Sequence, residues 1–360
     1  MVKKISQELN QSQGKKEPWL AVNLSLFFPG IGQFYAQKFT KAFLWSISQL
    51  GVLIFSMWSI FSPQGSVRSG LIALVIAAFI YLFNILDAHL SVHLDLKDTS
   101  LEKIPRRHKN PWFAVFVSRI MPGLGHLYGN QSVLGLIFLT ISLILLSLAN
   151  YFPPLWVFPP LIAAFVTYHI YLTFPHQYHP HKHTHRNTLS IMVGVIFAWG
   201  VICNYFPRWL DYKLGVFSIP SESMLPTLHV GDRIFVKKSA NHSLKRGAVV
   251  VFRPSETARK MIPDGGEYFV KRIIGQPQET VEIKDGRVYI NNQPISESYI
   301  TEPPQYQWGP AVVPNDSYVV LGDNRNNSFD SHEWGFLPQE NLVGQAYKVF
   351  WPLERVKSLL

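Results

Sequence analysis

Two blocks of the sequence carry a serine and a lysine whose neighbours suit nucleophilic catalysis. Ser223 lies in the run from Ile219 to Leu228, and Lys271 lies in the apolar stretch from Tyr268 to Ile274. A serine hydroxyl is a weak nucleophile until a base takes its proton. A lysine can be that base only as the neutral amine, which apolar surroundings favour. The two blocks are therefore compatible with a hydrolase that pairs serine with lysine.

Other bases remain open on composition alone. No histidine lies in the Ser223 or Lys271 blocks, so a histidine base would have to be recruited from His229, His242 or His332. Two further basic side chains are weaker alternatives to Lys271. Arg272 cannot be deprotonated in a protein, and Lys260 lacks an apolar strand around it.

Two more blocks complete a recognisable order. Gly231 and Asp232 follow the serine block, and the run from Gly322 to Gly335 is rich in polar residues. Together the four blocks resemble those of bacterial type I signal peptidases, membrane-bound Ser-Lys endopeptidases that remove signal peptides from exported proteins. The resemblance extends from Val216 to Trp351 and says nothing about residues 1–188. Four blocks in this order are far more specific than a Ser-Met-x-Pro motif alone.

The resemblance implies roles for individual residues. Ser223 would be the nucleophile and Lys271 the general base, Ser221 would help the Ser223 backbone N–H bind the oxyanion, and Ser328 would orient the base. It implies neither a cofactor nor a metal, and its partners are signal-peptide-bearing preproteins. The remaining roles fall to residues that brace the site (Asp323, Arg325 and Asp330) and to residues that line pockets for the small side chains of an Ala-x-Ala cleavage motif (Ile219, Met224, Leu228 and Val270).

The sequence departs from the family pattern at two places. His332 stands where the family often has arginine, so a brace to Asp330 would become weaker and sensitive to pH. Pro277-Gln278-Glu279 replaces a common Pro-Gly-Asp and removes a turn glycine. Neither change touches the proposed nucleophile or base.

The elements that carry these blocks are predicted to be strands. Short β-type runs without helix-length apolar periodicity predict a mostly β domain over residues 208–360, and Asp285-Gly286 indicates a hairpin. The expected fold class is thus a membrane α-helical N-terminal half followed by a mostly β extracytoplasmic catalytic domain with a signal peptidase-like fold. The predicted strands are Ile234–Val236, Val249–Phe252, Tyr268–Ile274, Thr280–Ile283, Val288–Ile290 and Tyr318–Leu321.

The first half of the chain has the composition of a membrane protein. Charged residues make up 16% of the chain, against about 25% in soluble proteins, and nine units of the net charge of +10 precede Arg208. This positive charge lies between apolar runs, which disfavours nucleic acid as a partner and favours a lipid bilayer. Five uncharged runs are long enough to span a membrane: Phe43–Phe61, Ser69–Leu86, Ser132–Ala149, Leu155–Phe174 and Leu189–Tyr205.

Two further apolar stretches, Trp19–Tyr35 and Trp112–Tyr128, are interrupted by Pro-Gly-x-Gly and are not expected to span. They match one another at a constant offset of 93 residues, which indicates a duplication. The unit resembles small two-helix membrane modules found in many bacterial proteins. The expected organisation is a tail (1–17), two repeats (18–110 and 111–188), a final anchor (189–207) and the peptidase domain (208–360).

Charge predicts the topology. Five spans place the basic loop Asp87–Asn110 and the histidine-rich loop Pro175–Thr188 in the cytoplasm with the N-terminus, whereas seven spans would move the first loop outside. Either count leaves the peptidase outside the cytoplasmic membrane. The five histidines of the second loop are interpreted as part of a cationic loop rather than a metal site. Cys203 is the single cysteine, so no intrachain disulfide forms.

Two other classes of protein compete with an active peptidase. The duplicated half could be the functional part, as a transporter or scaffold, with an inactive outer domain. The intact set of Ser221, Ser223, Lys271 and Ser328 argues against this. A self-cleaving Ser-Lys repressor would need a DNA-binding segment and no membrane anchor.

Overall fold

The computed structural model describes residues 16–94, 109–174, 189–202, 213–238, 244–262 and 266–360. The chain divides into two compact units. One comprises Met1–Phe55 and Ile72–Pro207, and the other comprises Ser56–Leu71 and Arg208–Leu360. The unit that holds the C-terminal domain thus includes a short segment from the first repeat, which the sequence did not suggest.

Four helices are long and apolar enough to cross a membrane, as predicted for four of the five spans. They cover Phe39–Phe61, Val67–His93, Ser132–Ala149 and Leu155–Thr173. The fifth predicted span is described only as the shorter apolar helix Leu189–Ile202. Cys203 and the rest of that span, like the histidine-rich loop, lie outside the described residues.

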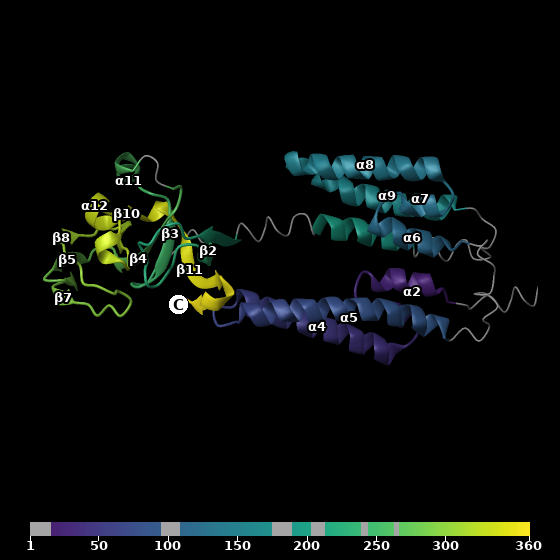
Figure 1. Ribbon diagram of the computed structural model, residues 1–360, viewed down its shortest axis with the longest axis horizontal. Helices are drawn as coiled ribbons and strands as arrows, with labels where there is room; N and C mark the ends of the chain where they lie inside the picture. The colour runs from purple at the N-terminus through teal and green to yellow at the C-terminus, as the bar shows by residue number, and fades with distance from the viewer. Residues whose placement is uncertain (1–15, 95–108, 175–188, 203–212, 239–243, 263–265) are drawn as a thin grey trace, which may run out of the picture. The chain divides into compact units, whose positions relative to one another are not determined.

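The helices of the first repeat are α2 (Pro18–Ser25), α3 (Ile31–Tyr35), α4 (Phe39–Phe61) and α5 (Val67–His93) (Figure 1). The second repeat has α6 (Pro111–Ile120), α7 (Leu124–Tyr128), α8 (Ser132–Tyr151), the 3₁₀ turn η3 (Pro153–Val157) and α9 (Phe158–Thr173). Each Pro-Gly-x-Gly stretch is broken into two short helices, as expected.

One boundary was wrong. Helix α5 continues to His93, so Asp87 lies in the helix and not in the loop to which the sequence assigned it. Its carboxylate accepts hydrogen bonds from Lys41 Nζ at 2.7 Å and Trp45 Nε1 at 3.0 Å. These partners from α4 let a carboxylate remain inside an otherwise apolar helix.

The contacts around each Pro-Gly-x-Gly recur at the offset of 93 residues. Gly30 and Gly123 both have a positive φ, 98° and 102°, which glycine adopts without steric cost. Tyr35 Oη accepts from the backbone N–H of Glu17, and Tyr128 Oη accepts from that of Asn110, each at 3.0 Å. This recurrence supports the duplication inferred from the sequence.

The C-terminal unit is built on two antiparallel sheets (Figure 1). The larger has the order β1-β2-β11-β3-β4-β9-β10, with β12 paired to β11, and the smaller has the order β7-β6-β5-β8. The strands are β1 (Leu214–Ser218), β2 (Arg233–Lys238), β3 (Val249–Phe252), β4 (Phe269–Gly275), β5 (Thr280–Lys284), β6 (Arg287–Ile290), β7 (Gln293–Pro294), β8 (Trp308–Val312), β9 (Ser317–Leu321), β10 (Leu337–Pro338), β11 (Leu342–Trp351) and β12 (Lys357–Ser358).

All six predicted runs are strands, and the Asp285-Gly286 hairpin joins β5 to β6 with φ of 52° and 70°. The fold class is therefore as predicted: apolar helices precede a mostly β domain. The sequence missed β11, the longest strand, because Gly344, Gln345 and Lys348 interrupt its apolar pattern.

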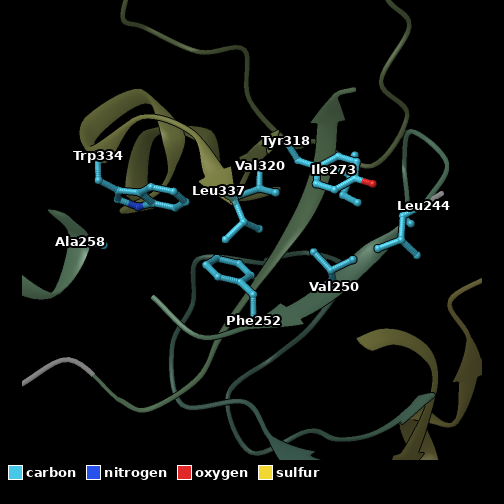
Figure 2. Packing of buried hydrophobic residues seen from close by; sticks show 10 residues of the cluster. Leu244, Val250, Phe252, Ala258, Ile273, Tyr318, Val320, Trp334 and Leu337 are labelled. Atoms are coloured by element: carbon cyan, nitrogen blue, oxygen red, sulfur yellow. The ribbon is translucent and has the colours of Figure 1, made fainter. Parts of the chain in front are cut away.

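A hydrophobic cluster fixes the strands that carry the polar blocks. Figure 2 shows Phe252 of β3, Leu337 of β10 and Trp334 gathered against one another, with Phe252 and Trp334 ring centroids 6.0 Å apart. The short helices α11 (Glu256–Met261) and α12 (Ser331–Trp334) contribute residues to this cluster. The unit also contains three 3₁₀ turns among its described residues: η4 (Arg325–Asn327), η5 (Gln339–Asn341) and η6 (Leu353–Arg355).

Candidate active site

Lys271 lies in the middle of the larger sheet. Its strand, β4, pairs with β3 on one side and β9 on the other, and Lys271 stands opposite Val250. Only 5% of Lys271 is exposed, and its Nζ lies 2.6 Å from Ser223 Oγ. The sheet therefore holds a buried amine within hydrogen-bonding distance of a serine hydroxyl.

Burial also changes the acidity of this amine. Desolvation lowers the pKa of Lys271 from 10.5 to about 8, although the negative charges of Asp330 and Asp323 oppose the shift. Because the charged form is the one that burial disfavours, the neutral amine becomes accessible close to neutral pH. The site thus supplies the form of lysine that can accept a proton.

Ser223 lies in the irregular segment that follows β1. Ser221 Oγ is 3.2 Å from Ser223 Oγ, so a second hydroxyl lies beside the first. The backbone N–H of Asn324 donates to Ser223 O at 3.1 Å, and Asn324 Nδ2 donates to Glu222 O at 3.2 Å. These bonds join the serine segment to the loop after β9.

Gly322 begins that loop and lies very close to the serine segment. A Cβ at this position would overlap both Ser223 O and Ser328 Oγ. Its backbone is held on both sides, because its N–H donates to Asp330 Oδ2 at 2.8 Å and its carbonyl accepts from Arg325 Nε at 3.0 Å. Gly322 was not assigned a role in the sequence analysis, since close backbone approach leaves no signal in a single sequence.

The three residues expected to brace the site make buried contacts. Asp323 accepts two hydrogen bonds from Arg272, at 2.8 and 2.6 Å. Arg325 donates to both carboxylate oxygens of Glu297, at 2.8 and 2.6 Å. Glu297 was missed, because it follows β7 in the chain, far from the four blocks. It ties the loop after β9 to the connection between β7 and β8 of the smaller sheet.

Asp330 contacts the residue that departs from the family pattern. His332 Nδ1 lies 2.8 Å from Asp330 Oδ1, and the His332 ring stacks on Tyr306 with centroids 4.0 Å apart. Burial disfavours the protonated ring, but the hydrogen bond and charge of Asp330 outweigh this and raise the pKa of His332. The brace forms with histidine in place of arginine.

Ser328 behaves differently from expectation. Its Oγ is buried and has no hydrogen-bond partner among the described residues, so the expected bond to Lys271 is not made in this structure. The hydroxyl instead lies against Gly322. Its role as an orienting group stays a prediction.

A cleft of 520 Å³ opens beside Ser223 and Lys271. Of the four expected pocket residues, Ile219, Met224 and Val270 line it. Leu228 does not; it is fully buried in the core beneath, together with Ile219 and Met224. Residues before β4 that the sequence did not single out, including Ile262 and Tyr268, form part of the wall.

The alternative bases lie in other settings. Arg272 is paired with Asp323, and His332 is bonded to Asp330. Lys260 is exposed on α11, His229 is exposed between β1 and β2, and His242 lies outside the described residues.

A serine hydroxyl bonded to a buried amine beside an apolar cleft, in a mostly β domain, is the arrangement of a serine hydrolase. The model of the family "signal peptidase, peptidase S26" matches residues 187–351. Signal peptidase I of Leptolyngbya laminosa is 54% identical over 143 residues, which cover 39% of this chain and 70% of that protein. Given these matches, the chain belongs to the signal peptidase family and is a serine peptidase.

Other signal peptidases are also similar to this chain. A probable signal peptidase I-1 of Synechocystis is 49% identical over 178 residues, covering 49% of this chain and 87% of that protein. Signal peptidase I T of Bacillus subtilis is 36% identical over 155 residues, covering 39% and 76%. A crystal structure of signal peptidase I from Enterococcus faecalis is 30% identical, covers 29% of this chain and 97% of that one, and superposes with a TM-score of 0.24.

Proposed function

We propose that this chain removes signal peptides from exported preproteins by a Ser-Lys mechanism, with Ser223 as nucleophile and Lys271 as general base. The observation that carries this proposal is the 2.6 Å distance between Ser223 Oγ and the buried Lys271 Nζ. The family relatives named above are signal peptidases, which supports the same reaction for this chain.

The reaction depends on proton transfers to and from Lys271. Neutral Lys271 accepts the Ser223 hydroxyl proton as Oγ attacks the scissile carbonyl carbon, and the resulting ammonium then protonates the departing amine of the mature protein. The signal peptide is left as an ester on Ser223. Lys271, neutral again, takes a proton from the water that hydrolyses this ester and returns it to Ser223 Oγ.

Ser221 is positioned to assist the charged intermediate. Its hydroxyl lies 3.2 Å from Ser223 Oγ, beside the carbon that Ser223 attacks, where it can donate to the developing oxyanion together with the Ser223 backbone N–H. Such donors contribute most when they are held in place before the charge develops.

The cleft supports a preference for small side chains before the cut. Ile219, Met224 and Val270 line the cleft together with Ser223 and Lys271, so we assign them to the pockets for the first and third residues before the cut, which are the two alanines of an Ala-x-Ala motif. Replacing the alanine immediately before the cleavage site of a preprotein by leucine should abolish cleavage, because an overfilled pocket displaces the scissile carbonyl. Equal cleavage of both preproteins would overturn this assignment.

The substrates are embedded in a bilayer through their signal peptides, and the four apolar helices suit the same location. We assign the chain to the cytoplasmic membrane, with the peptidase on its outer face and cleavage close to the lipid surface.

The dyad is tested with the purified full-length chain in detergent and a preprotein substrate. Ser223→Ala and Lys271→Ala should each abolish cleavage, and Lys271→Arg should also be inactive because its charge cannot be lost. Lys260→Ala, which changes an exposed lysine of α11, is the matched control and should retain activity. Turnover by the Ser223→Ala or Lys271→Ala variant above a contaminating-protease control would overturn the dyad.

A further inference from the structure

Lys348 is a buried lysine that the reaction does not use. It lies in β11 with none of its surface exposed, and it stands opposite Phe235 of β2 and Ser358 of β12. Among the described residues no carboxylate pairs with it. A buried ammonium without a counter-ion needs strong hydrogen-bond acceptors to be tolerated.

Those acceptors are four backbone carbonyl oxygens from residues 59–65. Lys348 Nζ lies 3.1 Å from Ser59 O, 2.9 Å from Ile60 O, and 2.8 Å from both Ser62 O and Gly65 O. These residues form the end of α4 and the turn before α5, and they belong to the same compact unit as the peptidase.

The chemistry of a helix end suits this arrangement. The last carbonyls of a helix have no intrahelical donor and carry partial negative charge, so a cation beside them is stabilising. Ser59 and Ile60 lie in the last turn of α4. One lysine thus satisfies several acceptors that would otherwise face an apolar strand surface.

Aromatic packing surrounds the cation. The rings of Phe61 and Phe235 have centroids 5.4 Å apart, and Phe235 in turn stacks on Phe350 at 4.1 Å. Phe235 and Phe350 lie on β2 and β11, the same two strands that frame Lys348. The contact therefore combines an apolar patch with a polar centre, as interfaces between folded parts do.

The turn between α4 and α5 is closely packed. Ser56 Oγ donates to Gly70 O at 2.8 Å and joins the two helices beneath it. A Cβ on Gly65 would overlap Ser59 O, one of the four acceptors. Only glycine leaves the carbonyls of Ser59 and Gly65 free to converge on one point.

We propose that the tip of the α4–α5 hairpin, residues 56–71, is a docking element for the peptidase sheet, and that Lys348 locks the two together. The peptidase is then held by the first repeat of the duplicated region as well as by its direct chain connection. This assigns a function to that region: it fixes the position of the cleft for a substrate that is itself held in the bilayer.

The docking is tested without reference to activity. The full-length chain in detergent is treated with an amine-reactive ester, and modification of each lysine is followed by mass spectrometry. Burial lowers the pKa of Lys348, so an accessible Lys348 would react faster than ordinary lysines, and slow reaction reports protection. We expect Lys348 to react at least tenfold more slowly than Lys237, an exposed lysine of β2.

Two glycine variants test whether the hairpin tip protects Lys348 from modification. Gly65→Ala should bring the reaction rate of Lys348 close to that of Lys237, because the added Cβ displaces Ser59 O. Gly51→Ala is the matched control, since a Cβ there meets no atom within 4 Å, and it should leave Lys348 protected. Rapid modification of Lys348 in the unaltered chain, or continued protection in Gly65→Ala, would overturn the docking.

The consequence for catalysis rests on the proposed function and has its own readout. Lys348→Met keeps the apolar stem and removes the cation. It should cleave a short soluble peptide at the normal rate but a preprotein in lipid vesicles at least tenfold more slowly, with Lys237→Met as control. Equal rates on the vesicle-bound preprotein would refute a positioning role, whereas failure of the unaltered chain to cleave either substrate would refute the proposed function and leave the labelling result standing.

Discussion

Lys271 works as a base only after it has lost its proton, and its surroundings set the pH at which that occurs. With a pKa of about 8, the neutral fraction rises with pH, reaches about one half near pH 8 and approaches completion about one to two pH units higher. The value of kcat/KM for a peptide should therefore increase about tenfold per pH unit below pH 8 and become constant above it.

The measurement is a pH profile of kcat/KM from pH 6 to 10. A profile with its midpoint near pH 6.5 that disappears in His332→Gln would assign the base to a histidine. A flat profile over the whole range would show that no group with the acidity of Lys271 limits the reaction.

Gly322 gives a second prediction for a single residue. Gly322→Ala should lower kcat/KM by about 100-fold, because a Cβ overlapping Ser223 O must displace the nucleophile, and a shift of about 1 Å costs that much. Circular dichroism and the thermal midpoint serve as controls for folding. Normal kcat/KM in a folded Gly322→Ala variant would contradict the close packing described for this loop.

The sequence was enough to predict the two residues assigned to the chemistry, but not all of the residues that position them. Ser223 and Lys271 lie in blocks whose order and spacing are specific, and the structure brings them together from 48 positions apart. Glu297 acts through an ion pair with Arg325, a residue distant in the sequence. Gly322 acts by letting its backbone lie close to the serine segment. Such features depend on the folded arrangement, so the residue types alone do not indicate them.

At the scale of elements, the connection between β4 and β5 contains the second departure from the family pattern. Gln278 has a φ of 69°, in the left-handed region, where the family often has glycine. A residue with a Cβ loses about 1–2 kcal/mol there, while glycine costs about 0.5–1 kcal/mol in unfolded-chain entropy. Gln278 therefore adopts a left-handed backbone conformation that glycine would adopt at a lower cost.

Gln278→Gly should stabilise the peptidase by about 0.5–1 kcal/mol, which corresponds to about 1–4 °C in its thermal midpoint. Gln278→Ala is the matched control, because it also removes the side-chain bond to Asn315 but retains the Cβ. It should not be stabilising. An equal or lower midpoint for Gln278→Gly would show that the left-handed turn stores no strain.

Strands and spans were predictable where their patterns were uniform. The run Val249–Phe252 is apolar throughout and coincides with β3, and the four helices that are long and apolar enough to cross a membrane coincide with long uncharged runs. Strand β11 was hidden because Gly344, Gln345 and Lys348 interrupt its apolar pattern, and Lys348 is the residue that contacts the hairpin tip. One of the three residues that concealed the strand is therefore the one to which we assign the docking role.

For the whole molecule, the contact between Lys348 and residues 59–65 constrains the topology. The turn after α4 must lie on the same side of the membrane as the peptidase that it contacts. With five spans and a cytoplasmic N-terminus, α4 is the first crossing, so its end and the peptidase are both outside. With seven spans the turn would be cytoplasmic while the peptidase remained outside. The contact thus favours five spans independently of the charge distribution.

Cysteines at the two ends of α4 separate these arrangements. In a Cys203→Ser background, Thr40→Cys and Gln64→Cys place single thiols at exposed positions in the first turn of α4 and in the hairpin turn. A membrane-impermeant thiol reagent applied to intact cells should modify the cysteine at position 64 directly and that at position 40 only after permeabilisation. Seven spans predict the opposite result for both positions, because a crossing by residues 19–35 would invert α4. That inverted pattern would also separate the hairpin tip from the peptidase and so remove the basis for docking through Lys348.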